Sequence, residues 1–281
     1  MLLRADEEPG RVAEARTTTR RAGRTFALAA RLLPRELRDD VYLLYLVLRT
    51  LDDLVDDAHP HAAARVEAVE AWASGWTALG PEAEILADLA TRHPVPRQAV
   101  LDFCAGMRAD LDHRPPATEA DVDRYCHQVA GTVGLLMTSL LGLRPGADVG
   151  AAERAAAALG IAMQRTNILR DLDEDAAAGR CYVSAEAVAA HGPPVPGARA
   201  ALLRDQIARA DARYAEGLAG VDALAAGRPA IRAAAVMYRE ILRGLEAQTA
   251  RGEAGRVVVP TRRKLVVAGR AMLGRRGPLT A

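Results

Sequence analysis

The chain has 281 residues, half of them hydrophobic, and a formal net charge of +1 at pH 7. This balance gives no general attraction to nucleic acid, and we expect no nucleic-acid partner. The three cysteines, Cys104, Cys126 and Cys181, are widely spaced, which indicates neither a disulfide framework nor a zinc site. No signal peptide is evident, and no apolar run approaches the roughly 20 residues that span a bilayer, so we expect a cytoplasmic protein.

Residues 1–22 are charged and contain Gly and Thr, and we expect them to form a flexible N-terminal segment. Residues 23–281 are rich in good helix formers and predict one all-α domain. Breaks that contain Pro and Gly delimit the expected helices, at about 24–33, 36–57, 62–79, 82–91, 96–112, 118–142, 150–176, 199–224, 227–250 and 260–273.

The first candidate site is the segment Asp52–Asp57, which holds four carboxylates and follows one of the most apolar runs of the chain. On a helix, Tyr45, Arg49 and Asp52 recur at steps of four and three residues. Asp56 follows four residues later on the same face. Carboxylates are rarely buried unless they are paired or bind a metal. Either this helix end is exposed to solvent, or its carboxylates hold something cationic.

A second polar stripe lies far downstream. Its members step by four, three, four and four residues on a helix: Gly160, Gln164, Asn167, Asp171 and Asp175. Amide and carboxylate oxygens on successive turns suit Mg²⁺ that also binds substrate phosphate oxygens. Arginines lie beside both stripes, at Arg49 and Arg170. Together the stripes predict a diphosphate held between Mg²⁺ ions and arginines. The alternative is two unrelated acidic patches on the surface.

The third segment, Tyr125–Leu136, has two glycines inside an expected helix, Gly131 and Gly134. Each costs about 1 kcal/mol of helix stability relative to alanine. Close helix packing, a kink, or room for a bulky apolar ligand would explain them.

In this order the motifs resemble those of the squalene/phytoene synthase family, the head-to-head prenyltransferases, over about residues 23–260. The matching segments are Arg24-Thr25-Phe26 with Leu32-Leu33-Pro34, Tyr45–Asp57, Tyr125–Gly134, Gln164–Asp175, Gly179–Tyr182, Tyr238–Leu242 and Arg256. The resemblance implies an isoprenoid-synthase helical bundle around a central apolar cavity. A segment that resembles the family's Gly-Met-x-x-Asp places Asp110 either beside the metal site or on exposed surface.

The resemblance also implies roles for single residues. Metal ligands are expected at Asp52, Asp53, Asp56, Asn167, Asp171 and Asp175, and Asp57 is expected to be dispensable. Catalytic roles are expected for Tyr45, Tyr125, Asp52, Asp56, Asp171 and Asp175. Substrate contacts are expected at Arg24, Thr25, Phe26, Arg49, Val129, Gly134, Gln164, Asn167, Arg180, Tyr238 and Arg256.

The implied reaction condenses two allylic diphosphates, farnesyl (C15) or geranylgeranyl (C20), head to head through a cyclopropylcarbinyl diphosphate. It requires Mg²⁺, with Mn²⁺ as a substitute. Chain length, product, a requirement for NADPH and oligomeric state are left open. Two alternatives also stay open: a terpene cyclase acting on one prenyl diphosphate, and a non-catalytic subunit that binds prenyl lipids. The basic runs Arg262–Lys264 and Arg275–Arg276 fit either peripheral contact with an anionic membrane or a solvated surface.

Overall fold

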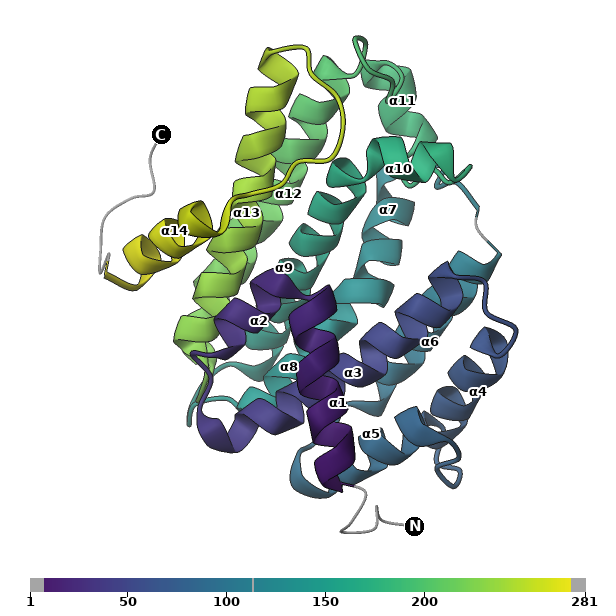
Figure 1. Cartoon of the computed structure of the whole chain (residues 1–281), viewed down its shortest axis with the longest axis vertical. Helices are drawn as coiled ribbons and strands as arrows, with labels where there is room; N and C mark the ends of the chain where they lie inside the picture. Colours follow the sequence, from purple (N-terminus) through teal and green to yellow (C-terminus); the bar gives the residue numbers. More distant parts are fainter. Residues whose placement is uncertain (1–7, 113, 274–281) are drawn as a thin grey trace.

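The structure is a computed structural model that describes residues 8–112 and 114–273, and its described part is a bundle of helices (Figure 1). The helices are α1 (Glu8–Ala22), α2 (Arg24–Ala30), α3 (Arg35–Asp56), α4 (Ala62–Ala73), α5 (Pro81–Arg92), α6 (Arg97–Leu111), α7 (Glu119–Cys126), η1 (His127–Gly131), α8 (Thr132–Leu141), α9 (Val149–Arg170), α10 (Leu172–Ala177), α11 (Ala185–His191), α12 (Ala200–Gly220), η2 (Val221–Ala223), α13 (Arg228–Ala250) and α14 (Thr261–Leu273). No strand forms within these residues, and the all-α prediction is confirmed.

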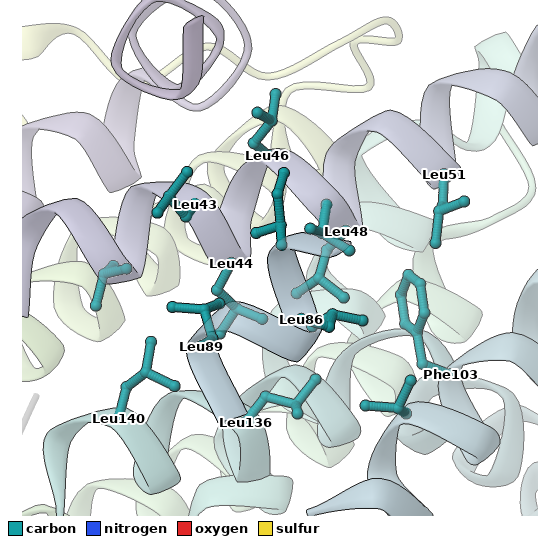
Figure 2. Close-up of a cluster of buried hydrophobic side chains, with 14 of the residues drawn as sticks. Leu43, Leu44, Leu46, Leu48, Leu51, Leu86, Leu89, Phe103, Leu136 and Leu140 are labelled. Carbon is teal, nitrogen blue, oxygen red and sulfur yellow. The ribbon is translucent and has the colours of Figure 1, made fainter. Parts of the chain in front are cut away.

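The two largest hydrophobic clusters of the described residues organise the bundle. The first surrounds α3, whose leucines pack against Leu86 and Leu89 of α5, Phe103 of α6 and Leu136 of α8 (Figure 2). The second joins α9, α12 and α13 through residues such as Tyr214, which is fully buried. Helix α9 makes its most extensive contacts with α12 and also contacts α8 and α13. It therefore lies between the two halves of the molecule.

Several predicted helices agree closely with the structure. Those at 36–57, 82–91, 96–112 and 227–250 differ from α3, α5, α6 and α13 by no more than one residue at each end. Others are shorter or interrupted: the helix predicted at 62–79 ends at Ala73, where Gly75 adopts a φ of 99°. Helix α11 was not predicted at all. The segment before α11 is short. The side chain of Ser184 caps the first turn of α11.

Residues 8–22, which we expected to belong to a flexible N-terminal segment, form helix α1, while residues 1–7 lie outside the described part. Helix α1 packs on α3. Ala15 and Thr19, four residues apart, are fully buried. Arg16 donates hydrogen bonds of 2.8 to 3.0 Å to the carboxylate of Asp39 on α3. The helix is held by small residues and ion pairs, so it lacks the apolar stripe that sequence periodicity detects.

Close packing between α9 and the η1–α8 segment explains glycines in both. A Cβ atom at Gly134 would clash with the carbonyl oxygen of Ala156 on α9, and one at Gly160 would clash with the carbonyl oxygen of Ala130. Residues 127–131 adopt a π-helical turn at this contact. Gly134 and Gly160 also line the cavity described below. Close helix packing therefore explains Gly134, which also borders the cavity, whereas a Cβ atom at Gly131 would first meet the ring of His127.

We predict that Gly160→Ala lowers the free energy of unfolding by about 1–3 kcal/mol, because the new methyl group meets backbone rather than a movable side chain. Denaturant unfolding measures this change. The matched control is Gly269→Ala in α14, where the same methyl group meets nothing within 4 Å. That variant gains about 0.5–1 kcal/mol. Equal stability of the two variants would contradict this packing argument.

Candidate active site

A cavity of about 660 Å³ opens between the two halves of the bundle. Along α9, its lining changes from Ala152, Ala156 and Leu159 to the polar Gln164 and Asn167 as the helix approaches its C-terminal end. Along α3, it changes in the same way from Leu44 and Leu48 to Arg49 and Asp52. The C-terminal ends of both helices therefore form a polar mouth above an apolar interior. The interior also includes Phe103, Val133, Met137, Leu141, Met163, Val221, Leu224, Ile231 and Ile241.

The first acidic cluster lies at the end of α3. Arg49 donates a 2.8 Å hydrogen bond to Asp52 and a second bond to Asp53. Burial raises the pKa of Asp52 to about 7, Arg49 opposes this shift, and the neighbouring Asp56 and Asp53 add to it. The helix ends after Asp56. The cluster thus holds more negative charge than Arg49 compensates.

The second cluster is a hydrogen-bonded chain at the end of α9. The hydroxyl of Tyr238 on α13 donates to Asn167 Oδ1 at 2.6 Å, and Asn167 Nδ2 donates to Gln164 Oε1 at 3.1 Å. Arg170 donates to the Tyr238 hydroxyl at 3.2 Å and to Asp171 Oδ1 at 2.8 Å. These bonds fix the orientation of the Asn167 amide and of the Arg170 guanidinium at the mouth.

Asp171 interrupts the helix predicted at 150–176. Its backbone leaves the helical region (φ −101°, ψ 8°), and α10 begins at the next residue. The Asp175 N–H still donates to the Asp171 carbonyl at 2.8 Å, so the two residues stay one turn apart. Burial, followed by the nearby Asp171, raises the pKa of Asp175 to about 6. Asp173 points elsewhere and accepts a 2.6 Å hydrogen bond from Arg199.

One ion pair joins the two clusters. Arg180, which follows α10, donates a 3.1 Å hydrogen bond to Asp56 Oδ1 at the end of α3. Asp110 of α6 lies nearby, because both Asp56 and Arg180 influence its pKa. Burial raises that pKa to about 6. Asp56 of α3 influences the pKa values of both Asp110 on α6 and Asp175 on α10, so these carboxylates lie in one region although they are far apart in sequence.

The squalene/phytoene synthase family model matches residues 19–263 of the chain. The chain belongs to this family. A phytoene synthase of Thermus thermophilus is 39% identical over 232 residues, which cover 78% of this chain and 77% of that protein. A presqualene diphosphate synthase of Zymomonas mobilis is 34% identical over 240 residues, covering 80% of each chain. A solved dehydrosqualene synthase with a bound ligand has a TM-score of 0.85 at 26% identity, covering 95% of this chain and 97% of that one.

These matches confirm the predicted family, its all-α fold and the enzyme type, a transferase of the squalene/phytoene synthase kind. At the level of the family, they also confirm the head-to-head condensation of prenyl diphosphates.

In this squalene/phytoene synthase, most of the predicted site residues line one cavity: Thr25, Phe26, Tyr45, Arg49, Asp52, Val129, Gly134, Gln164, Asn167, Tyr238 and Arg256. Arg256 bonds to Glu174 and lies 3.4 Å from Asp171. Asp53, Asp56, Asp171, Asp175 and Arg180 are not part of the cavity wall and lie around it through the contacts described above. The side chain of Arg24 lies outside the described part of the structure.

The two predicted catalytic tyrosines lie in different places. The ring of Tyr45 faces the cavity and stacks on Phe26 at 5.0 Å, and its hydroxyl approaches Gly23, where a Cβ atom would collide with it. Tyr125 is not among the cavity-lining residues. Its hydroxyl donates to Asp110 at 3.1 Å, and its ring stacks on Tyr182, whose hydroxyl bonds to the same carboxylate. Tyr125 thus holds Asp110 beside the acidic clusters.

The sequence interpretation missed two cations of the cavity wall, Arg21 and Lys264. Lys264 of α14 donates a 2.7 Å hydrogen bond to the hydroxyl of Thr25. It was placed instead in a basic run that fits a surface. One signal was available in the sequence: Lys264 is the only lysine of the chain.

The donor atoms at the mouth fit Mg²⁺, which prefers hard oxygen ligands. Asp52, Asp53, Asp56, Asn167, Asp171 and Asp175 supply such oxygens. Within residues 8–112 and 114–273, however, no three acidic, His or Cys side chains already converge on a single point. Asp52, Asp56 and Asp171 instead form ion pairs with arginine side chains. The residues therefore suit ions that take one or two carboxylates here and complete their coordination with water and substrate phosphate.

We predict that Asp175→Asn raises the melting temperature in EDTA at pH 8 by about 2–4 °C, which corresponds to about 1 kcal/mol after allowance for solvent screening. The folded-state pKa of Asp175 is raised to about 6, so its charge destabilises the fold above that pH. The gain disappears as the pH falls through 6 towards 4, where the wild-type carboxyl is protonated.

Asp173→Asn is the matched control on the same short helix. Hydrogen bonds from Arg199 lower the pKa of Asp173, so its charge stabilises the fold above its ordinary pKa. This variant loses stability at pH 8, and its deficit shrinks in acid. Thermal unfolding across pH 4–8 measures both variants. A destabilised Asp175→Asn would contradict the assignment of an unfavourable, partly buried charge at this position.

Proposed function

We propose that the protein condenses two allylic prenyl diphosphates, farnesyl or geranylgeranyl diphosphate, head to head in a Mg²⁺-dependent reaction of terpenoid biosynthesis. One observation carries the proposal. Two carboxylate clusters from distant segments, joined by the Arg180–Asp56 ion pair, border the mouth of a single apolar cavity. The polar mouth suits diphosphates, and the apolar interior suits prenyl chains.

The mouth neutralises a diphosphate through two kinds of group. Arg49, Arg170 and Arg256 line it and present N–H donors to phosphate oxygens in bidentate fashion. Asp52, Asp53 and Asp56 on one side, with Asn167, Asp171 and Asp175 on the other, would hold the metal. When bound, Mg²⁺ supplies positive charge that favours departure of the diphosphate. Tyr238 positions both Asn167 and Arg170 for this task.

The interior protects a carbocation after the diphosphate leaves. Its walls are aliphatic side chains, Phe103 and the stacked pair of Phe26 and Tyr45, so water is excluded. The face of an aromatic ring attracts a cation by about 0.5–2 kcal/mol. Burial raises the pKa of Tyr45 to about 12, so its hydroxyl stays protonated and the ring adds no negative charge.

Product analysis tests the proposed reaction. The protein is incubated with farnesyl or geranylgeranyl diphosphate and Mg²⁺ or Mn²⁺, with and without NADPH, and the products are identified by mass spectrometry. C30 or C40 products support the proposal and report the chain length. A cyclic C15 or C20 product would replace it with a terpene cyclase, and no turnover of either substrate would favour a prenyl-lipid-binding subunit.

We predict that Asp56→Asn lowers kcat/KM by at least about 100-fold, because it removes a charge-stabilising group at the mouth. Asp57→Asn is the matched control, since this exposed residue follows the last turn of α3 and lines no part of the cavity. Its kcat/KM stays within about twofold of wild type. Equal losses in the two variants would contradict the ligand assignment.

We also propose that the enzyme acts in the cytoplasm at a membrane surface. No helix in the described ranges is both long and apolar enough to cross a bilayer. Helix α14 nevertheless exposes Leu265, Val266 and Met272 beside Arg262 and Arg263, and it carries no acidic residue. Apolar side chains next to basic ones fit an anionic lipid surface. The wall of the cavity continues into the segment before α14, at Val257–Val259.

We predict that vesicles containing anionic phospholipid co-sediment the protein, and that Leu265→Glu with Val266→Glu reduces the bound fraction at least about tenfold. Val149→Glu is the control: Val149 and Leu265 are both 56% exposed, but Val149 begins α9 on another surface. If Val149→Glu and the double variant reduced binding equally, the α14 surface would be excluded.

A further inference from the structure

Two antiparallel helical walls, α9 and the η1–α8 segment, run along the cavity from its mouth to its closed end. Ala130 lies against Gly160, and Gly134 lies against Ala156 about one turn deeper. This register places Leu141, at the end of α8, beside the first turn of α9. Both helices line the cavity over most of their length. The rise of the helices therefore measures the depth of the cavity.

A floor tied by backbone hydrogen bonding closes the far end of the cavity. Leu141, Leu224 and Ala152 line the cavity at this end, and all three are buried. The N–H of Ala226 donates to the carbonyl of Leu141 at 3.1 Å. Leu224 forms an antiparallel bridge with Leu143. These contacts join the segment after η2 to the end of α8, so the floor cannot recede without breaking them.

The depth of the cavity can be compared with the lengths of the two candidate prenyl chains. Gln164 is the innermost polar side chain of α9 on the cavity wall. Ala152 lies about 18 Å further along the same continuous helix, at about 1.5 Å per residue. An extended chain gains about 1.2 Å per bond, so a geranylgeranyl group spans about 18 Å and a farnesyl group about 13 Å. The C20 chain reaches the floor, whereas the C15 chain ends close to Ala156.

A shorter chain leaves the apolar end of the cavity unfilled. The side chains of Ala152, Leu141 and Leu224 offer only carbon atoms to a ligand at the floor. A chain that lacks the last C5 unit buries less apolar surface and leaves a void against these side chains. The diphosphates of the two substrates are identical, so the mouth does not distinguish them. Discrimination between the two chains therefore has its physical basis at the floor.

We propose that the cavity selects the C20 substrate, geranylgeranyl diphosphate, and that Ala152 is a specificity-determining residue. The inference rests on the proposed function and deepens it, because that function leaves the choice between C15 and C20 open. The methyl group of Ala152 ends the wall of α9 at the depth where the longer chain ends. A larger side chain at this position would shorten the cavity from below and leave the mouth unchanged.

Binding of unreactive thiolodiphosphate analogues of the two substrates tests this selection without turnover. In these probes a sulfur atom replaces the oxygen between the prenyl carbon and phosphorus, so the diphosphate does not leave. Calorimetry with Mg²⁺ is expected to show that wild type binds the geranylgeranyl analogue at least about 10-fold more tightly than the farnesyl analogue. Equal affinities, or tighter binding of the farnesyl analogue, would overturn the proposal.

Substitutions along α9 test the depth itself. Ala152→Leu is expected to weaken binding of the geranylgeranyl analogue at least about 10-fold, while the affinity for the farnesyl analogue stays within about threefold of wild type. A misfolded variant would lose both. Ala151→Leu is the matched control, because this exposed neighbour lines no part of the cavity. It is expected to bind both analogues like wild type. Equal weakening of both analogues by Ala152→Leu would contradict a floor at this residue.

A third variant on the same helix checks the scale. Ala156→Leu leaves about 12 Å below Gln164, which is shorter than either chain, and is expected to weaken both analogues at least about 10-fold. An Ala156→Leu variant that discriminated only against the longer analogue would contradict this scale. The three positions thus predict three different patterns of binding.

Turnover separates this inference from the proposed function. For wild type, kcat/KM for geranylgeranyl diphosphate is expected to exceed that for farnesyl diphosphate at least about 10-fold, and Ala152→Leu is expected to reverse the order. A wild-type enzyme that condenses farnesyl diphosphate more efficiently refutes the selection of C20 and leaves the condensation intact. A wild-type protein that forms no condensation product refutes the proposed function, and analogue binding then still decides whether the cavity selects the C20 chain.

Discussion

Burial of carboxylates at the mouth of an apolar cavity, with the repulsion between them, is the constraint on which the rest of the structure depends. Asp52, Asp110 and Asp175 come from three separate helices, and the pKa of each is raised to about 6 or 7. Such shifts mean that the folded chain disfavours these charges. The arginines that bond to the acidic clusters offset part of the repulsion. The remainder destabilises the folded state at the mouth of the cavity.

Helix α9 links the acidic mouth of the cavity to the packed body of the bundle. Its N-terminal half packs against α8 and α12 and forms the apolar wall, and its C-terminal end carries the second cluster. Gly160 allows the backbone of α9 to contact that of η1 at Ala130. This contact holds α9, which bears the second cluster, against the η1–α8 segment, and α8 in turn packs on α3, which bears the first cluster. The close packing thus lies along the body of α9, while its charged C-terminal end faces the mouth of the cavity.

The sequence predicted most of this arrangement, because its signals were local. A run of apolar residues ending in Asp52–Asp57 marks a buried helix with a polar end, whatever its neighbours are. The missed features depend on the neighbours. Helix α1 is anchored by the small Ala15 and Thr19, whose burial requires the matching surface of α3. At Asp171 the backbone leaves the helical conformation, and no Pro or Gly in the sequence marks this break.

Side-chain direction was the other quantity that sequence spacing did not provide. Tyr45 and Tyr125 both belong to recognisable sequence motifs, but their side chains lie in different surroundings. The ring of Tyr45 faces the cavity, whereas the hydroxyl of Tyr125 bonds to Asp110. Lys264 belongs to a run of three basic residues, and the packing of α14 on α13 and beside Ala29 of α2 turns it inward. The directions of these side chains follow from contacts between elements far apart in the chain.

The absence of a preformed three-carboxylate centre in the described part of the chain has a mechanistic consequence. Asp52, Asp56 and Asp171 are each bonded to an arginine, so under the proposed function an ion would compete with that arginine for its ligand. An incoming diphosphate would offer the displaced arginines a new anionic partner and would give the ion additional oxygens. Metal and substrate would therefore stabilise each other's binding.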